Sequence, residues 1–270
     1  MSFYKIDDSI LTSIADAIRS KTGSVDPIQT TSMAAEIMSI SAGDTRFKTE
    51  MEAIDYYSLN DTQCSVLKPY CFYNDSKITD VNFENVLTIG NSAFYGCLAL
   101  ATASFPKCEY IETGAFATCR QLSEITFGSV TKINDGAFNS NCSSLQKVAF
   151  EYCGVIGSSA FTGCSRLSEV EGILSRAHKE AFLNCSRLTS LNFESMDFVG
   201  TNVFNNTGFT SVELPMLSTF ENSGAFAECK NLSSVSLPIA TNISSYTFNN
   251  CVLLSDIYAP NVSMILEGAF

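Results

Sequence analysis

Cysteine is the residue type with the most chemical potential in this sequence. The chain has 11 cysteines in 270 residues and a single histidine, His178. A zinc site would need close Cys-x-x-Cys pairs or a neighbouring histidine, and neither pattern occurs. General acid–base catalysis most often uses histidine, and His178 lies in a charged stretch, residues 175–180, without a catalytic partner. We therefore predict no catalytic, cofactor-binding or metal-ligating residue, and we predict that the protein is not an enzyme.

The cysteines are regularly spaced because the chain is an internal repeat. A phenylalanine, usually preceded by alanine, recurs at steps of 22, 22, 22, 23, 21, 22, 22, 22 and 22 residues. The series is Phe72, Phe94, Phe116, Phe138, Phe161, Phe182, Phe204, Phe226, Phe248 and Phe270. Such a period is typical of a solenoid, in which each unit packs on its neighbours.

Each unit carries one segment with the pattern of a strand. In Leu122-x-x-Ile125-x-Phe127 the last residues alternate as in a half-buried strand, and Ile133 closes the unit. A coil of this size cannot bury its own apolar face, so we predict that the coils stack and their strands form a long parallel sheet. The irregular steps at Cys142 and between Phe204 and Phe209 are predicted to be one-residue loop adjustments on the outer face.

This unit, Leu-x-x-Val-x-Phe-Pro followed by Ile-x-x-x-Ala-Phe-x-x-Cys, resembles the BspA-like (Treponema-type) leucine-rich repeat over about residues 56–270. The resemblance implies a leucine-rich-repeat solenoid of about ten 22-residue repeats. Members of that family are commonly bacterial surface adhesins, and the repeat itself is a scaffold without chemistry to transfer. We assign residues 67–270 to the solenoid and residues 44–66 to a linker and a first incomplete coil.

Residues 1–43 do not follow the repeat and predict two short helices. Acidic residues and Ser9 precede the first apolar stripe, Gly23 ends it, and Thr30 to Ser32 can cap the second. The apolar faces consist of Ile10, Leu11, Ile14, Ile18, Met33, Ile37 and Met38. The predicted fold class is therefore an α+β repeat, with a helical hairpin before the solenoid. The hairpin either caps the first coil or anchors the chain to a larger assembly.

This N-terminal segment is similar to a helical module near the start of tail-associated proteins of phages and prophages of Gram-positive bacteria. The resemblance implies a virion protein, such as a fibre, a receptor-binding protein or a baseplate accessory, assembled in the bacterial cytoplasm. The first eight residues also lack the basic and apolar regions of a secretory signal. The alternative is a bacterial cell-surface leucine-rich-repeat adhesin, and a cell-wall-acting enzyme is the third hypothesis.

Seven cysteines share one repeat position, which predicts a buried ladder of free thiols. Equivalent Cβ atoms of stacked strands lie about 4.8 Å apart, whereas a disulfide needs about 3.8 Å. Free cysteine is also among the most buried residue types. The ladder consists of Cys97, Cys119, Cys142, Cys164, Cys185, Cys229 and Cys251.

The residues that flank the inward Ile or Val of each strand should point to solvent, and they are mostly polar. This face either serves solubility alone or forms a recognition surface, as solenoid faces often do. The candidate partner-binding residues are Asp80, Asn82, Glu124, Lys147, Glu169, Glu171, Asn192, Glu213, Asp256 and Tyr258.

The charge balance restricts the class of partner. The chain has 16 Lys and Arg against 28 Asp and Glu, a net charge of −12, and no basic run, which argues against nucleic-acid binding. No apolar stretch approaches the 18 residues of a membrane span. The expected partners are virion or tail proteins and a host surface protein or glycan. The sequence leaves open whether the chain forms a homo-oligomer.

Overall fold

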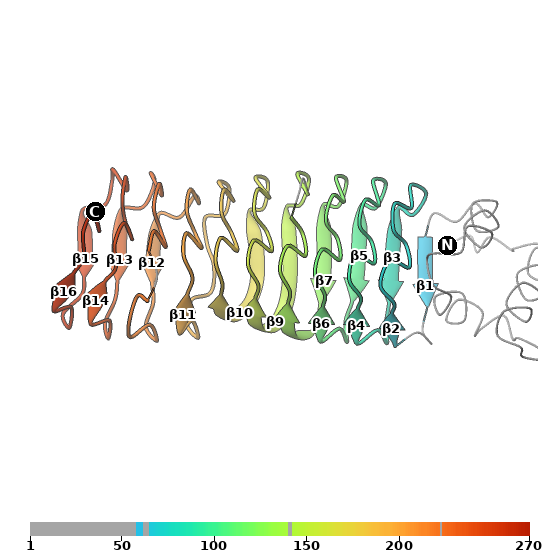
Figure 1. The fold of residues 1–270 in the computed structure, drawn as a ribbon, viewed down its shortest axis with the longest axis horizontal. Helices are drawn as coiled ribbons and strands as arrows, with labels where there is room; N and C mark the ends of the chain where they lie inside the picture. Colours follow the sequence, from blue (N-terminus) through green and yellow to red (C-terminus); the bar gives the residue numbers. More distant parts are fainter. Residues whose placement is uncertain (1–57, 62–64, 140–141, 222) are drawn as a thin grey trace, which may run out of the picture.

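The described part of the chain is an elongated stack of coils (Figure 1). The computed structural model describes residues 58–61, 65–139, 142–221 and 223–270. These residues form strands and turns and contain no α-helix. The helices predicted within residues 1–43, including Ile10, Leu11, Ile14, Ile18, Met33, Ile37 and Met38, lie outside the described residues.

The Leu-x-x-Ile-x-Phe segments form the first row of strands, as predicted, and neighbouring strands pair in parallel. The row begins with β1 (Ser58–Asp61), β3 (Asp80–Phe83), β5 (Thr102–Phe105), β7 (Glu124–Phe127) and the first residues of β9 (Lys147–Ile156) and β10 (Glu169–Ala177). It continues with β12 (Ser211–Glu213), β13 (Ser234–Ser236) and β15 (Asp256–Tyr258), which form a separate three-stranded sheet. We call the solvent side of this row, together with residues 189–194, the strand face.

The segments that close each coil form a second row of strands, so the prediction of one strand per coil was wrong. This row contains β2 (Val66–Leu67), β4 (Thr88–Ile89), β6 (Tyr110–Ile111), β8 (Ser129–Ile133), the last residues of β9 and β10, β11 (Phe198–Val199), β14 (Asn242–Ile243) and β16 (Met264–Ile265). The closing Ile or Val pairs with its equivalent in the next coil, as Ile111 does with Ile133. We call the solvent side of this row the closing face.

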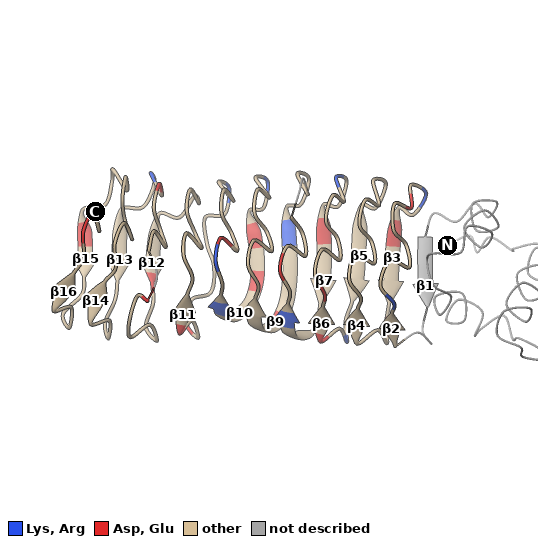
Figure 2. Ribbon diagram, viewed as in Figure 1, with Lys and Arg blue, Asp and Glu red and all other residues tan. Residues whose placement is uncertain are grey.

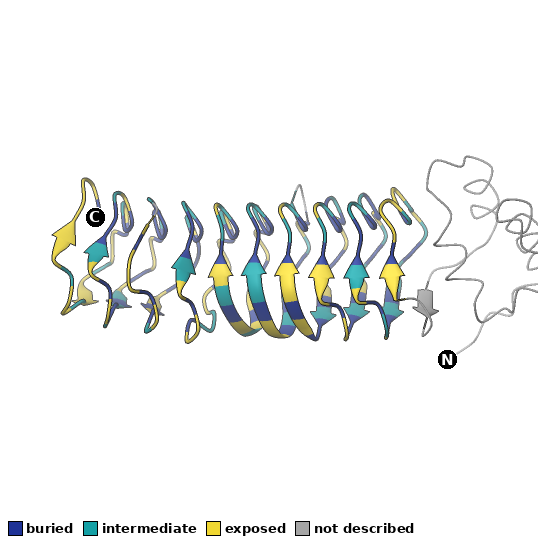
Figure 3. Cartoon of the chain, turned by 60° about the horizontal axis from the view of Figure 1, so that its bottom comes forward, coloured by how far each residue is buried: buried dark blue, intermediate teal, exposed yellow. Residues whose placement is uncertain are grey.

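Two coils carry a single long strand that belongs to both rows. β9 pairs with β7 through its first residues and with β8 through its last, which joins the rows into one 11-stranded sheet. Figure 3 shows β9 and β10 curving from one row to the other. Where Pro106 follows β5, the chain leaves the sheet because proline cannot donate a backbone hydrogen bond. The equivalent residue in β9 is Glu151, and the strand continues through it.

The repeated phenylalanines form a stack along the core. The ring centroids of Phe94, Phe116 and Phe138 lie 5.1 Å apart in succession, with planes inclined by 5° and 4°. All three side chains are fully buried, and the alanines that precede them are buried as well. The offset stacked arrangement is favourable for aromatic rings. The stack therefore fills the core from coil to coil, as the repeat predicts.

The turns beside each phenylalanine use left-handed backbone at two positions per coil. In one coil these are Gly114, with φ of 64°, and Thr118, with φ of 66°. Only glycine and asparagine adopt this conformation at little cost, and the equivalent positions of other coils are often Gly or Asn. The recurrent glycines before Ala-Phe are thus turn residues, in agreement with their position in the repeat.

The irregular step between Phe204 and Phe209 interrupts the first row, so its prediction as an outer-loop adjustment was wrong. The coil has one residue fewer between Thr207 and Phe209 than its neighbours have between the ladder cysteine and leucine. The backbone is drawn close here, because the Gly208 amide donates to Leu188 O at 2.9 Å, and a Cβ on Gly208 would lie 2.7 Å from Ser186 O. In the described residues, no backbone hydrogen bond joins residues 189–193 to β12.

Candidate partner-binding face

Strand register arranges the outward residues of the strand face in two rows that run along the solenoid. The first row contains Asp80, Thr102, Glu124, Lys147 and Glu169. The second contains Asn82, Ser104, Thr126, Ala149 and Glu171. Buried residues such as Val81, Ile125 and Val148 separate the two rows on the inner side of the strands. The rows are thus held by the core, and successive members lie one strand spacing, about 4.8 Å, apart.

The structure places all the candidate strand-face residues at the solvent side. Those that are exposed are Glu124, Glu169, Glu171, Glu213, Asp256 and Tyr258, and those that are half-buried are Asp80, Asn82, Lys147 and Asn192. The register does not bring them into one continuous group, because Glu213, Asp256 and Tyr258 belong to the three-stranded sheet beyond the interruption. Figure 2 shows acidic segments on β3, β7, β10 and β15 and a basic segment on β9.

The positive charge of Lys147 on β9 is balanced by two carboxylates of the neighbouring strand β10. Its Nζ lies 2.9 Å from a carboxylate oxygen of Glu171 and 3.5 Å from one of Glu169. The hydrogen bond with Glu171 raises the pKa of Lys147, and the same hydrogen bond lowers the pKa of the Glu171 carboxyl. Lys147 is the cation among the candidate residues, so the strand face as a whole carries negative charge.

A cavity of about 600 Å³ opens on the strand face at its interruption. Residues 189–194 line one side, and Ser211, Glu213 and Pro215 line the other. Two candidate residues, Asn192 and Glu213, are therefore part of one concave site, together with Glu194, which the sequence analysis did not select. The missing residue between Thr207 and Phe209 was the sequence signal for this site, because in this coil the shortening coincides with a close backbone approach at Gly208 and a break in strand pairing.

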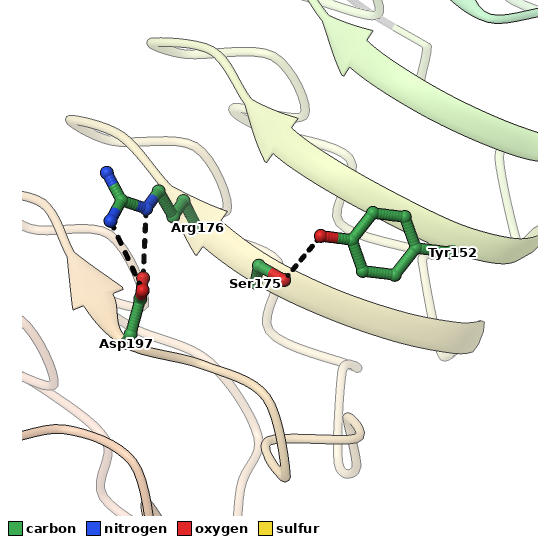
Figure 4. A network of polar contacts seen from close by, with 4 residues as sticks. All are labelled: Tyr152, Ser175, Arg176 and Asp197. Carbon is green, nitrogen blue, oxygen red and sulfur yellow. Dashed lines mark hydrogen bonds and ion pairs between the residues drawn. The ribbon is translucent and has the colours of Figure 1, made fainter.

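The closing face carries polar residues that the sequence analysis missed. On β9 and β10 the Tyr152 hydroxyl lies 2.9 Å from Ser175 Oγ, and Arg176 forms a two-point contact with Asp197 at 2.9 and 3.2 Å (Figure 4). The sequence analysis predicted no strand in these closing segments. The β-branched and aromatic residues of this stretch, Val148, Phe150, Tyr152, Val155 and Ile156, are the signal that could have shown a strand there.

The predicted ladder of free, buried thiols is confirmed in the described residues. All seven ladder cysteines are free and buried, and Cys108 and Cys153, at the start of closing segments, are buried as well. Each ladder thiol donates a hydrogen bond to the carbonyl oxygen of the repeat phenylalanine one coil earlier, as from Cys119 to Phe94 O at 3.0 Å. Burial raises the pKa of Cys142 and of Cys153 to about 12. These thiols are packing groups, since the thiolate is the reactive form.

One coil of the ladder has threonine in place of cysteine. Thr207 is buried, and its hydroxyl donates to Phe204 O at 2.8 Å and lies 3.2 Å from Cys229 Sγ. Unlike the ladder thiols, Thr207 donates to the phenylalanine of its own coil, so the position holds a small side chain and does not require sulfur chemistry.

His178 does not belong to a metal-ligating group in the part of the chain that the structure describes. The His178 ring is half-buried, with its centroid 5.2 Å from that of Phe198. Among the described residues, no group of three or more His, Cys, Asp and Glu is placed to hold a metal ion. None of the described residues belongs to a helix with the length and apolar content needed to cross a bilayer.

Comparison with known families identifies the repeat. The profile of the BspA type leucine rich repeat region matches residues 65–173 and 171–270. The chain belongs to the BspA-type leucine-rich-repeat family. The match begins at residue 65, so the resemblance of residues 1–43 to tail-associated proteins lies outside it. A search of curated proteins finds no matching sequence for this BspA-type chain.

Several solved leucine-rich-repeat structures are similar to this BspA-type solenoid. A leucine-rich repeat protein from Bacteroides ovatus is 24% identical over 79% of the chain, with a TM-score of 0.60, and the match covers 63% of that protein. A leucine rich cell surface protein from Faecalibacterium prausnitzii is 18% identical, with a TM-score of 0.49, over 80% of this chain and 79% of that one. A Leucine Rich Repeat protein from T. pallidum is 21% identical, with a TM-score of 0.28, over 78% and 74%. The likeness to the B. ovatus protein supports the fold alone.

Proposed function

We propose that this chain is a non-enzymatic binding protein displayed at a bacterial cell surface, and that its strand face contacts the partner. The observation that carries the proposal is the pair of polar rows on an exposed parallel sheet, held in fixed register by a continuous core. Solenoids use such extended faces for recognition because their spacing is rigid over many coils. Membership of a family whose members are commonly surface adhesins supports the location.

The strand face is suited to binding a macromolecule. Its outward residues are mostly Ser, Thr, Asn, Asp and Glu spread over many coils, so a partner would be recognised by many weak polar contacts. The net charge of −12 favours a partner with a positive surface, because complementary charge steers association. The partner is either a protein or a glycan of a host surface.

The location is tested by labelling with an antibody against the solenoid. Intact cells of the bacterium that carries the gene should be labelled, while induced and purified phage particles should not. Labelling of phage particles alone would contradict surface display and support the alternative of a tail-associated protein. The similarity of residues 1–43 to a helical module of tail-associated proteins favours that alternative. In that case deletion of residues 1–43 should abolish incorporation into particles, while the solenoid still folds.

The role of the strand face is tested by charge reversal. The unchanged chain is first applied to a printed array of host-surface proteins and glycans to find the molecules that it binds. We expect the triple variant E124K/E169K/E213K to lose binding to those molecules. The matched control, E109K/E221K/E267K, makes the same charge change at exposed carboxylates outside the strand face and should keep binding. Equal loss in both variants would mean that net charge acts without a specific face. Turnover of any glycan on the array would contradict the non-enzymatic proposal.

A further inference from the structure

The cavity at the interruption is the place where the strand face departs from its regular pattern. From β1 to β10 the strands of the first row pair in succession, whereas residues 189–193 and β12 lie on opposite sides of the cavity without a backbone hydrogen bond between them. The cavity of about 600 Å³ lies within the range of ligand-binding sites in proteins. A partner that lies along the strand face would therefore meet one concave position between flat ones.

The cavity lining offers hydrogen-bond acceptors and no cation. Its polar residues are Thr189, Ser190, Asn192, Glu194, Ser211 and Glu213. Neither Glu194 nor Glu213 forms an ion pair with a described residue, although both are exposed. The Asn192 amide oxygen accepts a hydrogen bond from the Glu194 backbone amide at 2.9 Å, which holds these two residues together.

The carboxylates of the adjacent coil do not compete for the same ligand. Glu169 and Glu171 on β10 are already paired with Lys147, at 3.5 and 2.9 Å. The carboxylates of Glu194 and Glu213 are therefore the available negative charges beside the interruption. The partly exposed apolar residues of the lining, Leu191 and Pro215, can contact the aliphatic part of a long side chain.

We propose that this cavity binds a lysine or arginine side chain of a partner protein that lies along the strand face. This inference rests on the proposed binding function and names the chemistry of its partner. A cationic side chain matches unpaired carboxylates, amide oxygen and hydroxyls, and its aliphatic stem matches the apolar lining. A glycan is less well matched, because the Phe193 ring, the aromatic group of the lining, is 7% exposed and cannot stack on a sugar.

The test uses the whole chain and a peptide of defined sequence, acetyl-Gly-Ser-Arg-Ser-Gly-amide, followed by NMR titration of the backbone amides. We expect saturable shifts at residues 189–194 and 211–213, binding that weakens as salt increases, and loss of binding when citrulline replaces arginine. E213Q and E194Q should each weaken binding by about tenfold, which corresponds to 1.4 kcal/mol. The matched control E109Q removes an exposed carboxylate outside both the cavity and the strand face and should leave the affinity unchanged.

Three results would overturn the inference. They are the absence of saturable shifts, equal binding of the citrulline peptide, and an equal effect of E109Q and E213Q. Binding of an N-acetylglucosamine oligomer that E213Q abolishes would assign the cavity to a glycan and would also overturn it. The proposed function is judged separately, because array binding or surface labelling can persist when the arginine peptide does not bind. Peptide binding without surface labelling would contradict the proposed location alone.

Discussion

The Cys97 thiol donates a hydrogen bond to the backbone oxygen of Phe72, which lies 3.0 Å away and 25 residues earlier in the sequence. The same contact recurs up to Cys251 and Phe226, at 3.1 Å. It ties each coil to the preceding one beside the phenylalanine stack. A cysteine suits this position because it is small and apolar, yet carries a weak donor for a buried carbonyl oxygen.

The ladder thiols should be unreactive in the native protein. Burial raises the pKa of Cys142 to about 12, and it also raises the pKa values of Cys97, Cys119, Cys164 and Cys185, so these thiols form almost no thiolate at neutral pH. Cys229 is the exception, because a hydrogen bond with Cys251 lowers its pKa. A thiol reagent should label few cysteines before denaturation and all 11 afterwards. Rapid native labelling of most thiols would contradict the buried ladder.

Replacing a ladder thiol should cost stability. C119A removes the hydrogen bond to Phe94 O and should lower the unfolding free energy by at least about 1 kcal/mol in urea denaturation. The matched control is C71A, because Cys71 occupies the repeat position of Ala93 and is only half-buried. The control should change stability by less than about 0.5 kcal/mol. Equal losses would mean that the hydrogen bond is not the cause.

Replacing a phenylalanine of the stack by alanine should cost little stability only where the ring is exposed. F116A removes a buried ring that stacks at 5.1 Å on both Phe94 and Phe138, and it should cost about 3–5 kcal/mol. Phe270 has the same repeat position but is 52% exposed and has a stacking contact with Phe248 alone. F270A should therefore cost much less, and a cost close to that of F116A would contradict this account of the core.

Thr118 is strained, and relieving the strain should stabilise the protein. It is β-branched with φ of 66°, whereas the equivalent residues Asn184 and Asn206 have φ of 63° and 57°. Asparagine adopts this conformation more easily, so T118N should raise the unfolding free energy by about 1 kcal/mol. The reverse change N184T should be destabilising, since it also removes the hydrogen bond from Asn206 to Asn184 Oδ1 at 2.9 Å. A loss of stability in T118N would contradict this interpretation.

The contact between Lys147 and Glu171 should appear in the pH dependence. Because Lys147 lowers the folded-state pKa of Glu171 below its ordinary 4.5, the contact stabilises the fold above that value and is lost as pH falls through the lowered pKa. In K147Q the titration midpoint of Glu171, measured by carboxyl NMR, should rise toward 4.5. K132Q removes a lysine of the closing face and should leave the midpoint unchanged. The effect on stability should be small, because both groups are solvent-exposed.

The amino-acid sequence by itself determined the period, the core and the solvent side of this protein. Phenylalanine, cysteine and the inward Ile or Val recur every 22 residues or so, and a repeated apolar position can only be buried by stacking. That is why the ladder of buried thiols and the outward placement of residues such as Glu124 and Tyr258 could be predicted. The second row of strands was less visible, because most of its strands have only two residues.

Only the tertiary structure decided which side chains meet across coils. Lys147 contacts Glu169 and Glu171 because strand register places β10 beside β9, and a periodic pattern does not specify rotamers. The cavity beside Glu213 likewise depends on three-dimensional packing. The sequence showed that one coil is a residue short, but the shortage could have been absorbed in an outer turn. The backbone packs closely at Gly208 instead, so the effect of the missing residue falls on the strand face, where the pairing of neighbouring strands is interrupted.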